Sequence, residues 1–396
     1  MKVGLYGISG VYNFGCEAIV RGATKLIRQL CPGAEIIYFT HNYDYDCRML
    51  SDLEIKIVKI EDKVNTLNRA TSKMCKLFHT EHRPLFLDTD SILRQVDSIW
   101  SIGGDLYTIP EYRRRNQKYE YYNAIADFCD RAVDAGKTVI LYGASVGPFG
   151  DYNKAVSYYV KNLKRYKMIM CREHDSYEYL KQCGLNNITF FPDPAFQVHG
   201  NNKTPKAKKY IGINLSPLSL KEIYGETSIE NKKKIAHLLE RIIDEFDTPI
   251  LMLPHVISKS ESDDDLRFQK GLIEEVDDGH RGRIQIADYA GGFLGLKPQI
   301  QQCKFVISAR MHCAINAIVE NIPAIMLSYS KKSIGMCKYV YESDDWVLGL
   351  SNIDSELIEK MQLMNNQYQT IANYLVNRNK EIENEYSVLL NGINLL

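Results

Sequence analysis

Short apolar runs alternate with amphipathic stretches along most of this chain, and this alternation restricts the fold more than any other feature. In the first half the apolar runs cover residues 3–6, 35–39, 98–102, 138–142, 168–171 and 189–191. Amphipathic segments such as 18–30 and 119–135 lie between them. Strands that alternate with helices in this way predict βαβ units and a parallel sheet.

The alternation stops at a polar stretch and then starts again. Residues 197–209 are mostly polar and include the run Gly-Asn-Asn-Lys-Thr-Pro-Lys, as in an exposed linker. Five further apolar runs follow at 210–215, 250–253, 284–286, 305–308 and 324–328, and apolar residues recur at helical spacing over 353–390. With 396 residues, the chain is too long for one ordinary core.

We therefore predict an α/β protein with two Rossmann-like lobes that face a cleft. The predicted domains are residues 1–200 and residues 208–352, and the second is expected to bind an anion. Residues 353–396 form a C-terminal helical segment that we expect to pack back on the first lobe, as terminal helices do in other two-lobed enzymes.

Composition excludes several classes of protein. Lys plus Arg equals Asp plus Glu at 49 each, and no basic run is interleaved with aromatics, so a nucleic-acid partner is not expected. The sequence has no signal-peptide pattern and no apolar stretch of 18 residues. The ten cysteines include no Cys-x-x-Cys pair. We expect a cytoplasmic enzyme without a structural metal. Peripheral binding at the inner face of the membrane is an alternative location.

The strand predicted at 305–308 breaks into polar residues as a helix begins. Ser308, Arg310 and His312 follow it. Such a junction places a fixed cation and a titratable imidazole at the positive end of a helix, which suits a small anion. The alternative is that Arg310 and His312 only satisfy local carbonyls. The strand at 168–171 ends in Arg172 and repeats the design, which favours the functional interpretation.

Further candidates follow other predicted strands, because ligands of open α/β sheets bind beyond the carboxyl ends of the strands. They are Asn13 and Glu17 in a glycine-rich turn, Gly103 and Gly104, Ser145, His255, and Lys332. Each also has a structural explanation: the glycines suit tight turns and Glu17 suits a helix dipole. The turn lacks the order of a dinucleotide site or a P-loop. The acidic run 263–265 is interpreted as a solvated helix start rather than a metal site.

The sequence resembles the polysaccharide pyruvyl transferase family. The matching pieces are Gly10–Glu17, with its Gly-x-x-Asn-Phe-Gly opening, Gly103-Gly104, Gly147-Pro148, Arg172 with Asp175-Ser176, Pro192–Phe196, Ser308–His312 with Arg-x-His at its centre, and Tyr329–Lys332. Together they span most of residues 3–335 in the expected order. One departure is Cys16, which stands where the family usually carries Asp.

The resemblance implies a fold of the glycosyltransferase B type and transfer of the enolpyruvyl group of phosphoenolpyruvate to a sugar, with formation of a pyruvate ketal and release of phosphate. It also implies that Arg172, Arg310 and His312 act in donor binding and catalysis. The implied acceptors are capsular or exopolysaccharide precursors, among them lipid-linked oligosaccharides at the cytoplasmic membrane face. No cofactor is expected besides phosphoenolpyruvate as donor substrate.

The expected chemistry assigns a role to each charged candidate. Two arginines from opposite lobes would clamp the phosphate and the carboxylate of the donor, since a guanidinium gives paired hydrogen bonds to such groups. Lys332 would add a point charge. His312 is the candidate acid and base. The alternative function is a glycosyltransferase that uses a nucleotide sugar, which the same architecture would support.

Overall fold

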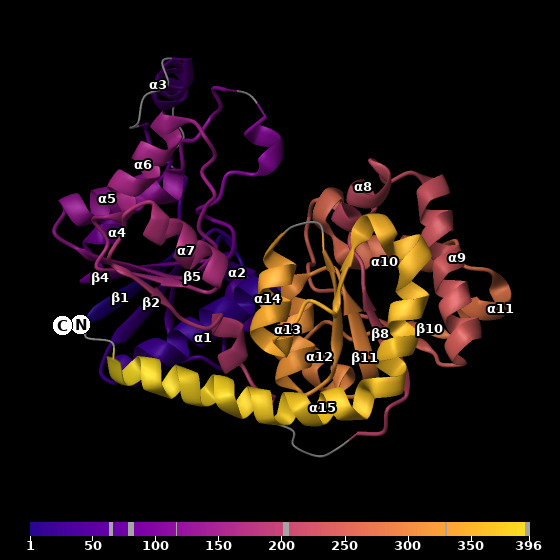
Figure 1. The fold of residues 1–396 in the computed structure, drawn as a ribbon. Coiled ribbons are helices and arrows are strands. Elements are labelled where there is room, and N and C mark those ends of the chain that lie inside the picture. The colour runs from indigo at the N-terminus through magenta and orange to yellow at the C-terminus, as the bar shows by residue number, and fades with distance from the viewer. Residues whose placement is uncertain (63–65, 78–82, 116, 201–205, 329–330, 393–396) are drawn as a thin grey trace. The chain divides into compact units, whose positions relative to one another are not determined.

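The computed structural model describes residues 1–62, 66–77, 83–115, 117–200, 206–328 and 331–392. The chain forms two compact units (Figure 1). Unit 1 contains Met1–Val11, Ile19–Pro194 and Val388–Leu396, and unit 2 contains Tyr12–Ala18 and Ala195–Ser387. Each described part has a parallel sheet and its own buried apolar core, so both predicted Rossmann-like lobes are confirmed.

Within the described residues, unit 1 holds a seven-stranded parallel sheet in the order β3-β2-β1-β4-β5-β6-β7. The strands are β1 (Lys2–Tyr6), β2 (Glu35–Thr40), β3 (Lys56–Lys59), β4 (Ser98–Ile102), β5 (Thr138–Ala144), β6 (Met168–Cys171) and β7 (Ile188–Phe190). The chain builds outward from β1 to one edge and then returns to build the other side. The reversal therefore falls between β1 and β4.

The helices associated with this sheet include several that the sequence predicts. They are α1 (Phe14–Leu30), α2 (Tyr43–Met49), α3 (Thr66–Leu77), α4 (Thr89–Leu93), α5 (Ala124–Asp134), α6 (Asn153–Leu163) and α7 (His174–Gln182), with the 3₁₀ helices η1 (Glu111–Arg113) and η2 (Pro194–Gln197). α5 begins with Asn123, whose side chain accepts hydrogen bonds from the backbone N–H groups of Ile125 and Ala126. The first residues of α1 belong to unit 2 and the remainder to unit 1.

Unit 2 holds a six-stranded parallel sheet in its described part, in the order β10-β9-β8-β11-β12-β13. The strands are β8 (Tyr210–Asn214), β9 (Ile250–Met252), β10 (Ile284–Ile286), β11 (Cys303–Ser308), β12 (Ala324–Ser328) and β13 (Val347–Gly349). This is the strand order of a Rossmann fold, with the reversal between β8 and β11. Ligands of such sheets bind beside this reversal, at the carboxyl ends of the strands.

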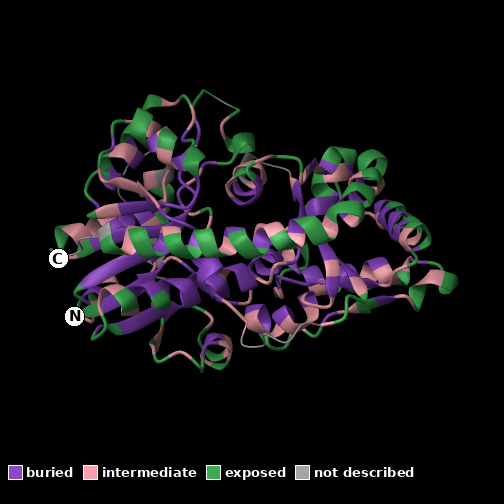
Figure 2. Ribbon diagram, turned by 60° about the horizontal axis from the view of Figure 1, so that its bottom comes forward, coloured by how far each residue is buried: buried purple, intermediate pink, exposed green. Residues whose placement is uncertain are grey.

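The helices of unit 2 cover its core, in which the strands are buried (Figure 2). They are α8 (Pro217–Tyr224), α9 (Ile229–Phe246), α10 (Asp265–Glu274), α11 (Asp278–Arg281), α12 (Gly292–Ile300), α13 (Met311–Val319), α14 (Lys331–Tyr341) and α15 (Ile353–Gly392), with η3 (Glu261–Asp263) and η4 (Leu350–Asn352). No helix of the described residues is long and apolar enough to span a membrane.

The C-terminal segment is one 40-residue helix, α15, as the apolar spacing over 353–390 predicts. Its apolar residues Leu357, Met361, Met364, Leu375 and Ile382 are buried in the core of unit 2. The helix therefore belongs to unit 2 up to Ser387 rather than forming a segment of its own, and its last residues group with unit 1. The boundary between the units also differs from the predicted one, since it lies at Pro194 and Ala195 and since unit 2 takes in Tyr12–Ala18.

Candidate active site

The predicted site residues fall into two groups, one in each unit. Gly103, Gly104, Ser145 and Arg172 belong to unit 1, whereas Asn13, Glu17, His255, Ser308, Arg310 and His312 belong to unit 2. Lys332 is the second residue of α14, and its side chain lies outside the described residues. The structure thus brings six of the candidates into one unit, although residues 13 and 312 are far apart in the sequence.

Arg310 lies directly after β11, at the reversal of strand order in the unit 2 sheet. Its Nε and Nη2 donate to Asp265 Oδ1 at 3.2 and 2.8 Å, and Nη2 also donates to Asp263 Oδ1 at 2.7 Å. Burial lowers the pKa of the Arg310 guanidinium, but the charges and hydrogen bonds of Asp265 and Asp263 outweigh this effect and raise it. Among the described residues, Nη1 makes no hydrogen bond.

The two carboxylates that hold Arg310 differ in their surroundings. The Asp265 side chain is completely buried, whereas that of Asp263 is 39% exposed. Asp265 Oδ2 also accepts hydrogen bonds from the backbone N–H groups of His255 and Val256. Burial raises the pKa of the Asp265 carboxyl, and the charge of Arg310 opposes this shift. Asp265 is therefore a fixed anchor, and Asp263 is a partner that an incoming anion can replace.

Asn214, at the end of β8, connects three strand ends. Its Oδ1 accepts from the backbone N–H of Arg310 at 2.9 Å and from the Ser308 hydroxyl at 3.3 Å. Its Nδ2 donates to the Leu253 carbonyl at 2.8 Å and to Asp265 at 3.2 Å. The Ser308 hydroxyl donates in addition to the Arg310 carbonyl at 2.7 Å. This network fixes the backbone on which Arg310 and His312 are carried, and it gives the predicted residue Ser308 a positioning role.

His312 lies in the first turn of α13, whose leading N–H groups have no acceptor within the helix. Its ring packs on Gly15: a Cβ atom added to Gly15 would come within 2.5 Å of His312 Nδ1 and 2.6 Å of Cγ. The Gly15 N–H donates to Asn13 Oδ1 at 3.0 Å, so Asn13 shapes the turn that carries this glycine. The glycine-rich turn thus supports the imidazole within unit 2.

The segment that carries Gly15 is tied to the loop after β9. The backbone N–H of Phe14 donates to the His255 carbonyl at 2.9 Å, and that of Ile257 donates to the Tyr12 carbonyl at 2.9 Å. Glu17 is completely buried, and its Oε2 accepts from the backbone N–H of Phe293 at 2.8 Å, in the first turn of α12. Its position favours a structural role at this helix end over contact with an acceptor sugar.

His255 is 1% exposed, and among the described residues neither of its ring nitrogens has a hydrogen-bond partner. The ring lies edge-on to Phe14 and Phe293, with centroid distances of 5.9 and 6.2 Å. Burial lowers the pKa of His255 to about 3, with smaller contributions from the charges of His312, Arg310 and Lys297. This imidazole is therefore neutral at physiological pH.

A second cluster lies at the strand ends of unit 1. The Arg172 guanidinium, which follows β6, is 3% exposed. Its Nη1 donates to Asp193 at 2.9 Å, and its Nε and Nη2 donate to the Ser145 hydroxyl at 3.1 and 2.8 Å. Nη2 also contacts Asp105 at 3.3 Å, and the Ser145 hydroxyl donates to Glu173. Burial lowers the pKa of Arg172, but the charges of Asp193, Asp105 and Glu173 outweigh this effect and raise it.

The glycines after β4 fit closely beside this cluster. Gly103 has a φ of +150°, and a Cβ atom on Gly104 would lie 3.5 Å from Arg172 Nη2. Ser145 and Gly104 are joined by a backbone hydrogen bond of 2.8 Å. The carboxyl ends of β4, β5 and β6 therefore meet at Arg172. All three guanidinium nitrogens already have partners. This favours a structural role for Arg172, in which it holds these loops together, rather than a role as a clamp for the donor.

Sequence reasoning missed three residues of the unit 2 cluster. The acidic run 263–265 is interpreted from sequence as a solvated helix start, and Asp264 does accept a hydrogen bond from Arg267 as the cap of α10. Asp263 and Asp265, however, turn to Arg310, and Asp265 is buried. Asn214 is a polar residue at the end of an apolar strand, and the same pattern that selected Ser308 from the sequence could have selected it. Among the described residues, no group of three or more His, Cys, Asp or Glu side chains is arranged to hold a metal ion.

The geometry defines an α/β protein with two Rossmann-like units, with an arginine and a histidine at the strand reversal of its second sheet. The model of the polysaccharide pyruvyl transferase family matches residues 13–331. The chain belongs to this family, and it is a transferase. The match includes both clusters described above.

The chain is also similar to a polysaccharide biosynthesis protein and, in its fold, to solved structures. The amylovoran biosynthesis protein AmsJ of Erwinia amylovora is 23% identical over 315 residues, which are 74% of this chain and 68% of that protein. The Staphylococcus aureus MnaA structure with UDP has a TM-score of 0.55 at 15% identity, covering 99% of this chain and 97% of that one. A Rickettsia africae glycosyltransferase has a TM-score of 0.52 at 11% identity, covering 98% of both chains. These structures share the fold.

Proposed function

We propose that this protein transfers the enolpyruvyl group of phosphoenolpyruvate to a sugar of a polysaccharide precursor, forms a pyruvate ketal and releases phosphate. The observation that carries the proposal is that a cation and an imidazole lie together in the chain at the strand reversal of unit 2. The cation is Arg310, which Asp265 orients, and the imidazole is His312, which packs on Gly15. Membership of the family supports a sugar acceptor. The name of the relative AmsJ supports an exopolysaccharide precursor.

The donor is an anion, and Arg310 is the cation that we assign to it. Its Nη1 remains available among the described residues, and the replaceable partner Asp263 occupies part of Nη2. The N-terminal N–H groups of α13 lie in the same turn and favour negative charge. We assign Arg310 and this helix end to the phosphate or carboxylate of phosphoenolpyruvate. Lys332, in the first turn of α14, is proposed to add a further cation.

The reaction needs two proton movements. A sugar hydroxyl adds to the central carbon of the enol, and the methylene carbon gains a proton. A second hydroxyl then displaces phosphate from the same carbon, which closes the ketal. We assign the proton transfers to His312, since imidazole both gives and takes protons near neutral pH. Nothing is oxidised or reduced, and the transferred group comes from the donor, so no added cofactor is proposed.

The competing function is a glycosyltransferase that uses a nucleotide sugar. The neighbour structures share only the fold, and fold does not decide chemistry. Thermal shift measurements with phosphoenolpyruvate and with UDP-N-acetylglucosamine separate the two functions. We expect phosphoenolpyruvate to stabilise the wild type and to lose this effect in Arg310→Lys. Stabilisation by the nucleotide sugar alone would reject the proposal.

We propose further that the reaction takes place in the cytoplasm, on a precursor that is lipid-linked in at least one of its natural forms. Mass spectrometry of a lipid-linked oligosaccharide fraction after incubation with phosphoenolpyruvate tests this. A gain of one ketal-bound pyruvate on the lipid-linked species is expected. Modification of free saccharides alone would contradict the lipid-linked acceptor and leave the transfer itself intact.

A further inference from the structure

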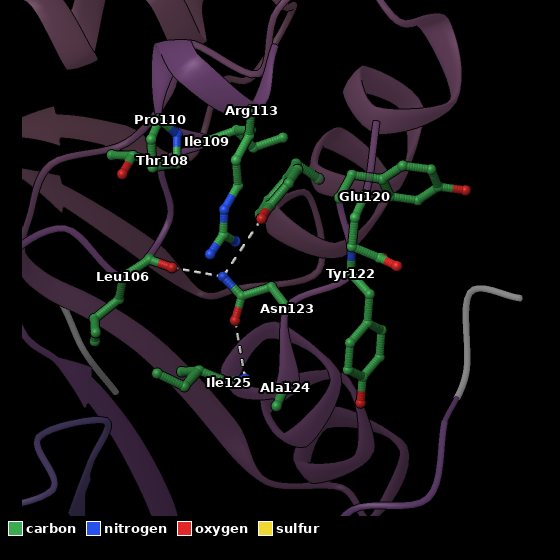
Figure 3. A pocket seen from close by; sticks show the side chains of 12 residues that line it. Leu106, Thr108, Ile109, Pro110, Arg113, Glu120, Tyr122, Asn123, Ala124 and Ile125 are labelled. Atoms are coloured by element: carbon green, nitrogen blue, oxygen red, sulfur yellow. Dashed lines mark hydrogen bonds between the residues drawn. The ribbon is translucent and has the colours of Figure 1, made fainter. Parts of the chain in front are cut away.

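Unit 1 contains a pocket of about 300 Å³ that the proposed chemistry does not use (Figure 3). It lies between the loop that follows β4 and the start of α5. Its lining includes Leu106 and Thr108 from that loop, Arg113 from η1, the segment Glu120–Ile125, and Tyr159 from α6. All of these residues belong to unit 1, whereas Arg310 and His312 belong to unit 2.

Aromatic side chains form rigid parts of the pocket wall. The Tyr159 ring stacks on Phe149 with a centroid distance of 4.2 Å. The Tyr122 hydroxyl donates to Asp127 at 2.9 Å, and the guanidinium of Arg83 lies 4.5 Å from the centre of the Tyr122 ring. Tyr side chains combine an apolar face with a polar end, so such walls suit a ligand that has both C–H surfaces and hydroxyl groups.

The pocket also presents hydrogen-bonding groups of both kinds. Figure 3 shows the Arg113 side chain pointing toward Asn123. Within the part of the chain that the structure describes, its one side-chain hydrogen bond runs from Nε to the Tyr112 hydroxyl at 3.2 Å, so both terminal nitrogens remain available. Glu120 Oε1 accepts from Arg83 at 2.8 Å, which holds this carboxylate at the pocket wall.

The Tyr159 hydroxyl also lines the pocket. The Asn123 amide donates to it at 3.5 Å and to the Leu106 carbonyl at 2.5 Å. Burial raises the pKa of Tyr159 to about 12, with smaller effects from Asn123, Arg113 and Glu120. The phenol is therefore a neutral group that can donate and accept. A guanidinium donor, a carboxylate acceptor and a phenol thus all belong to the lining of one pocket.

We infer that this pocket of unit 1 is a saccharide subsite, which binds one sugar residue of the glycan acceptor. A sugar ring places hydroxyls beside both charges and C–H groups against the aromatic wall, whereas a free phosphate would meet the Glu120 carboxylate. The volume lies at the lower end of the range for small-molecule sites, which fits one sugar ring. The inference rests on the proposed function insofar as that function supplies a glycan acceptor.

Binding measured without donor tests the subsite independently of pyruvyl transfer. The probes are the methyl glycosides of galactose, glucose and mannose, glucuronic acid, and inorganic phosphate, observed by saturation-transfer NMR for the sugars and ³¹P NMR for phosphate. We expect at least one sugar to bind the wild type and to lose about tenfold or more in affinity in Arg113→Ala, since a hydrogen bond to a charged group is lost. The matched control is Arg115→Ala, an exposed arginine that does not line the pocket.

Each outcome decides the inference. Arg113 is exposed, so its truncation leaves the core intact, and an unchanged melting temperature verifies this. If Arg113→Ala binds the sugar with the affinity of the wild type, or if the wild type binds no sugar, the inferred subsite is wrong. Arg113-dependent binding of phosphate without any sugar would replace it by an anion site. Sugar binding in a protein that fails to transfer pyruvate would reject the proposed function and leave the subsite standing.

Discussion

Asp265 holds Arg310 with one carboxylate oxygen, at 2.8 Å from Nη2 and 3.2 Å from Nε, while its other oxygen accepts from the backbone N–H groups after β9. Arg310, which follows β11, is thus fixed through Asp265 to the loop after β9, and its orientation is set before any ligand arrives. Preorganised cations of this kind stabilise developing charge without further reorganisation. The following predictions depend on this relationship and on the contact between His312 and Gly15.

The two carboxylates of Arg310 should respond differently to substitution. Asp265→Asn removes the buried charge that orients the guanidinium, and we expect kcat/KM for phosphoenolpyruvate to fall about a hundredfold, the cost of a misplaced reacting group. Asp263→Asn removes an exposed partner, which is worth little, so we expect less than about a fivefold change. Steady-state kinetics on both variants, with melting temperatures as control, provide the comparison. Equal effects would remove the distinction between anchor and replaceable partner.

Arg310→Lys keeps the charge but loses the planar fork. A lysine cannot hold Asp265 and present a second nitrogen to the donor, so we expect a loss of about tenfold or more in donor affinity. Isothermal titration with phosphoenolpyruvate measures it. The nearby exposed Arg267, which pairs with Glu261, supplies the control variant Arg267→Lys. Wild-type donor affinity in Arg310→Lys would argue against the clamp.

Gly15→Ala should displace the His312 ring. The added methyl group would lie 2.5 Å from Nδ1, closer than packed atoms approach, so the imidazole must move. We expect turnover to fall about a hundredfold while the fold persists. Gly33→Ala is the matched control, because a Cβ atom there meets nothing within 4 Å. A fully active Gly15→Ala variant would show that the position of this ring is unimportant.

His255 should make the protein sensitive to acid. Its pKa is lowered from 6.5 to about 3 by burial, so between these values the unfolded state binds a proton that the folded state does not. The neutral His255 therefore does not reduce the free energy of unfolding above pH 6.5. As the pH falls from 6.5 toward 3, this free energy decreases by about 1.4 kcal/mol per pH unit.

Urea unfolding of the wild type and of His255→Gln at pH 7.5, 6.0 and 5.0 tests this effect. The free energy of unfolding of the wild type should approach that of the variant as pH falls. Substitution of the exposed His237 by Gln provides the control and should leave the pH dependence unchanged. A constant difference between wild type and His255→Gln across this range would contradict a neutral buried imidazole.

The sequence predicts the strands of both sheets except β3 and β13. These two lie at sheet edges, and β3 reads Lys-Ile-Val-Lys, with only two apolar residues and no fully buried position. Short, partly exposed strands of this kind lack the continuous apolar run by which central parallel strands are recognised, although the other two edge strands, β7 and β10, are predicted. The fold class was accessible because most strands are central and buried.

The site is predictable only in part, because residues that contact one another in it are far apart in the sequence. Arg310 and His312 stand out as polar residues at a strand end, whereas Asp265 looks like an ordinary helix start. Its contact with Arg310, 45 residues away, depends on the pairing of β9, β8 and β11. The contact of Gly15 with His312 likewise requires that Tyr12–Ala18 belong to unit 2. Side-chain spacing within one element cannot report such contacts.

The most direct test of the central claim is release of phosphate from phosphoenolpyruvate, followed by ³¹P NMR with mass spectrometry of a saccharide acceptor in the same sample. We predict one phosphate for each pyruvate ketal formed by the wild type, and a rate lower by about 10² to 10⁴ in a folded His312→Ala variant. Phosphate release at the wild-type rate by His312→Ala, or transfer of a sugar from a nucleotide donor with none of pyruvate, would contradict it.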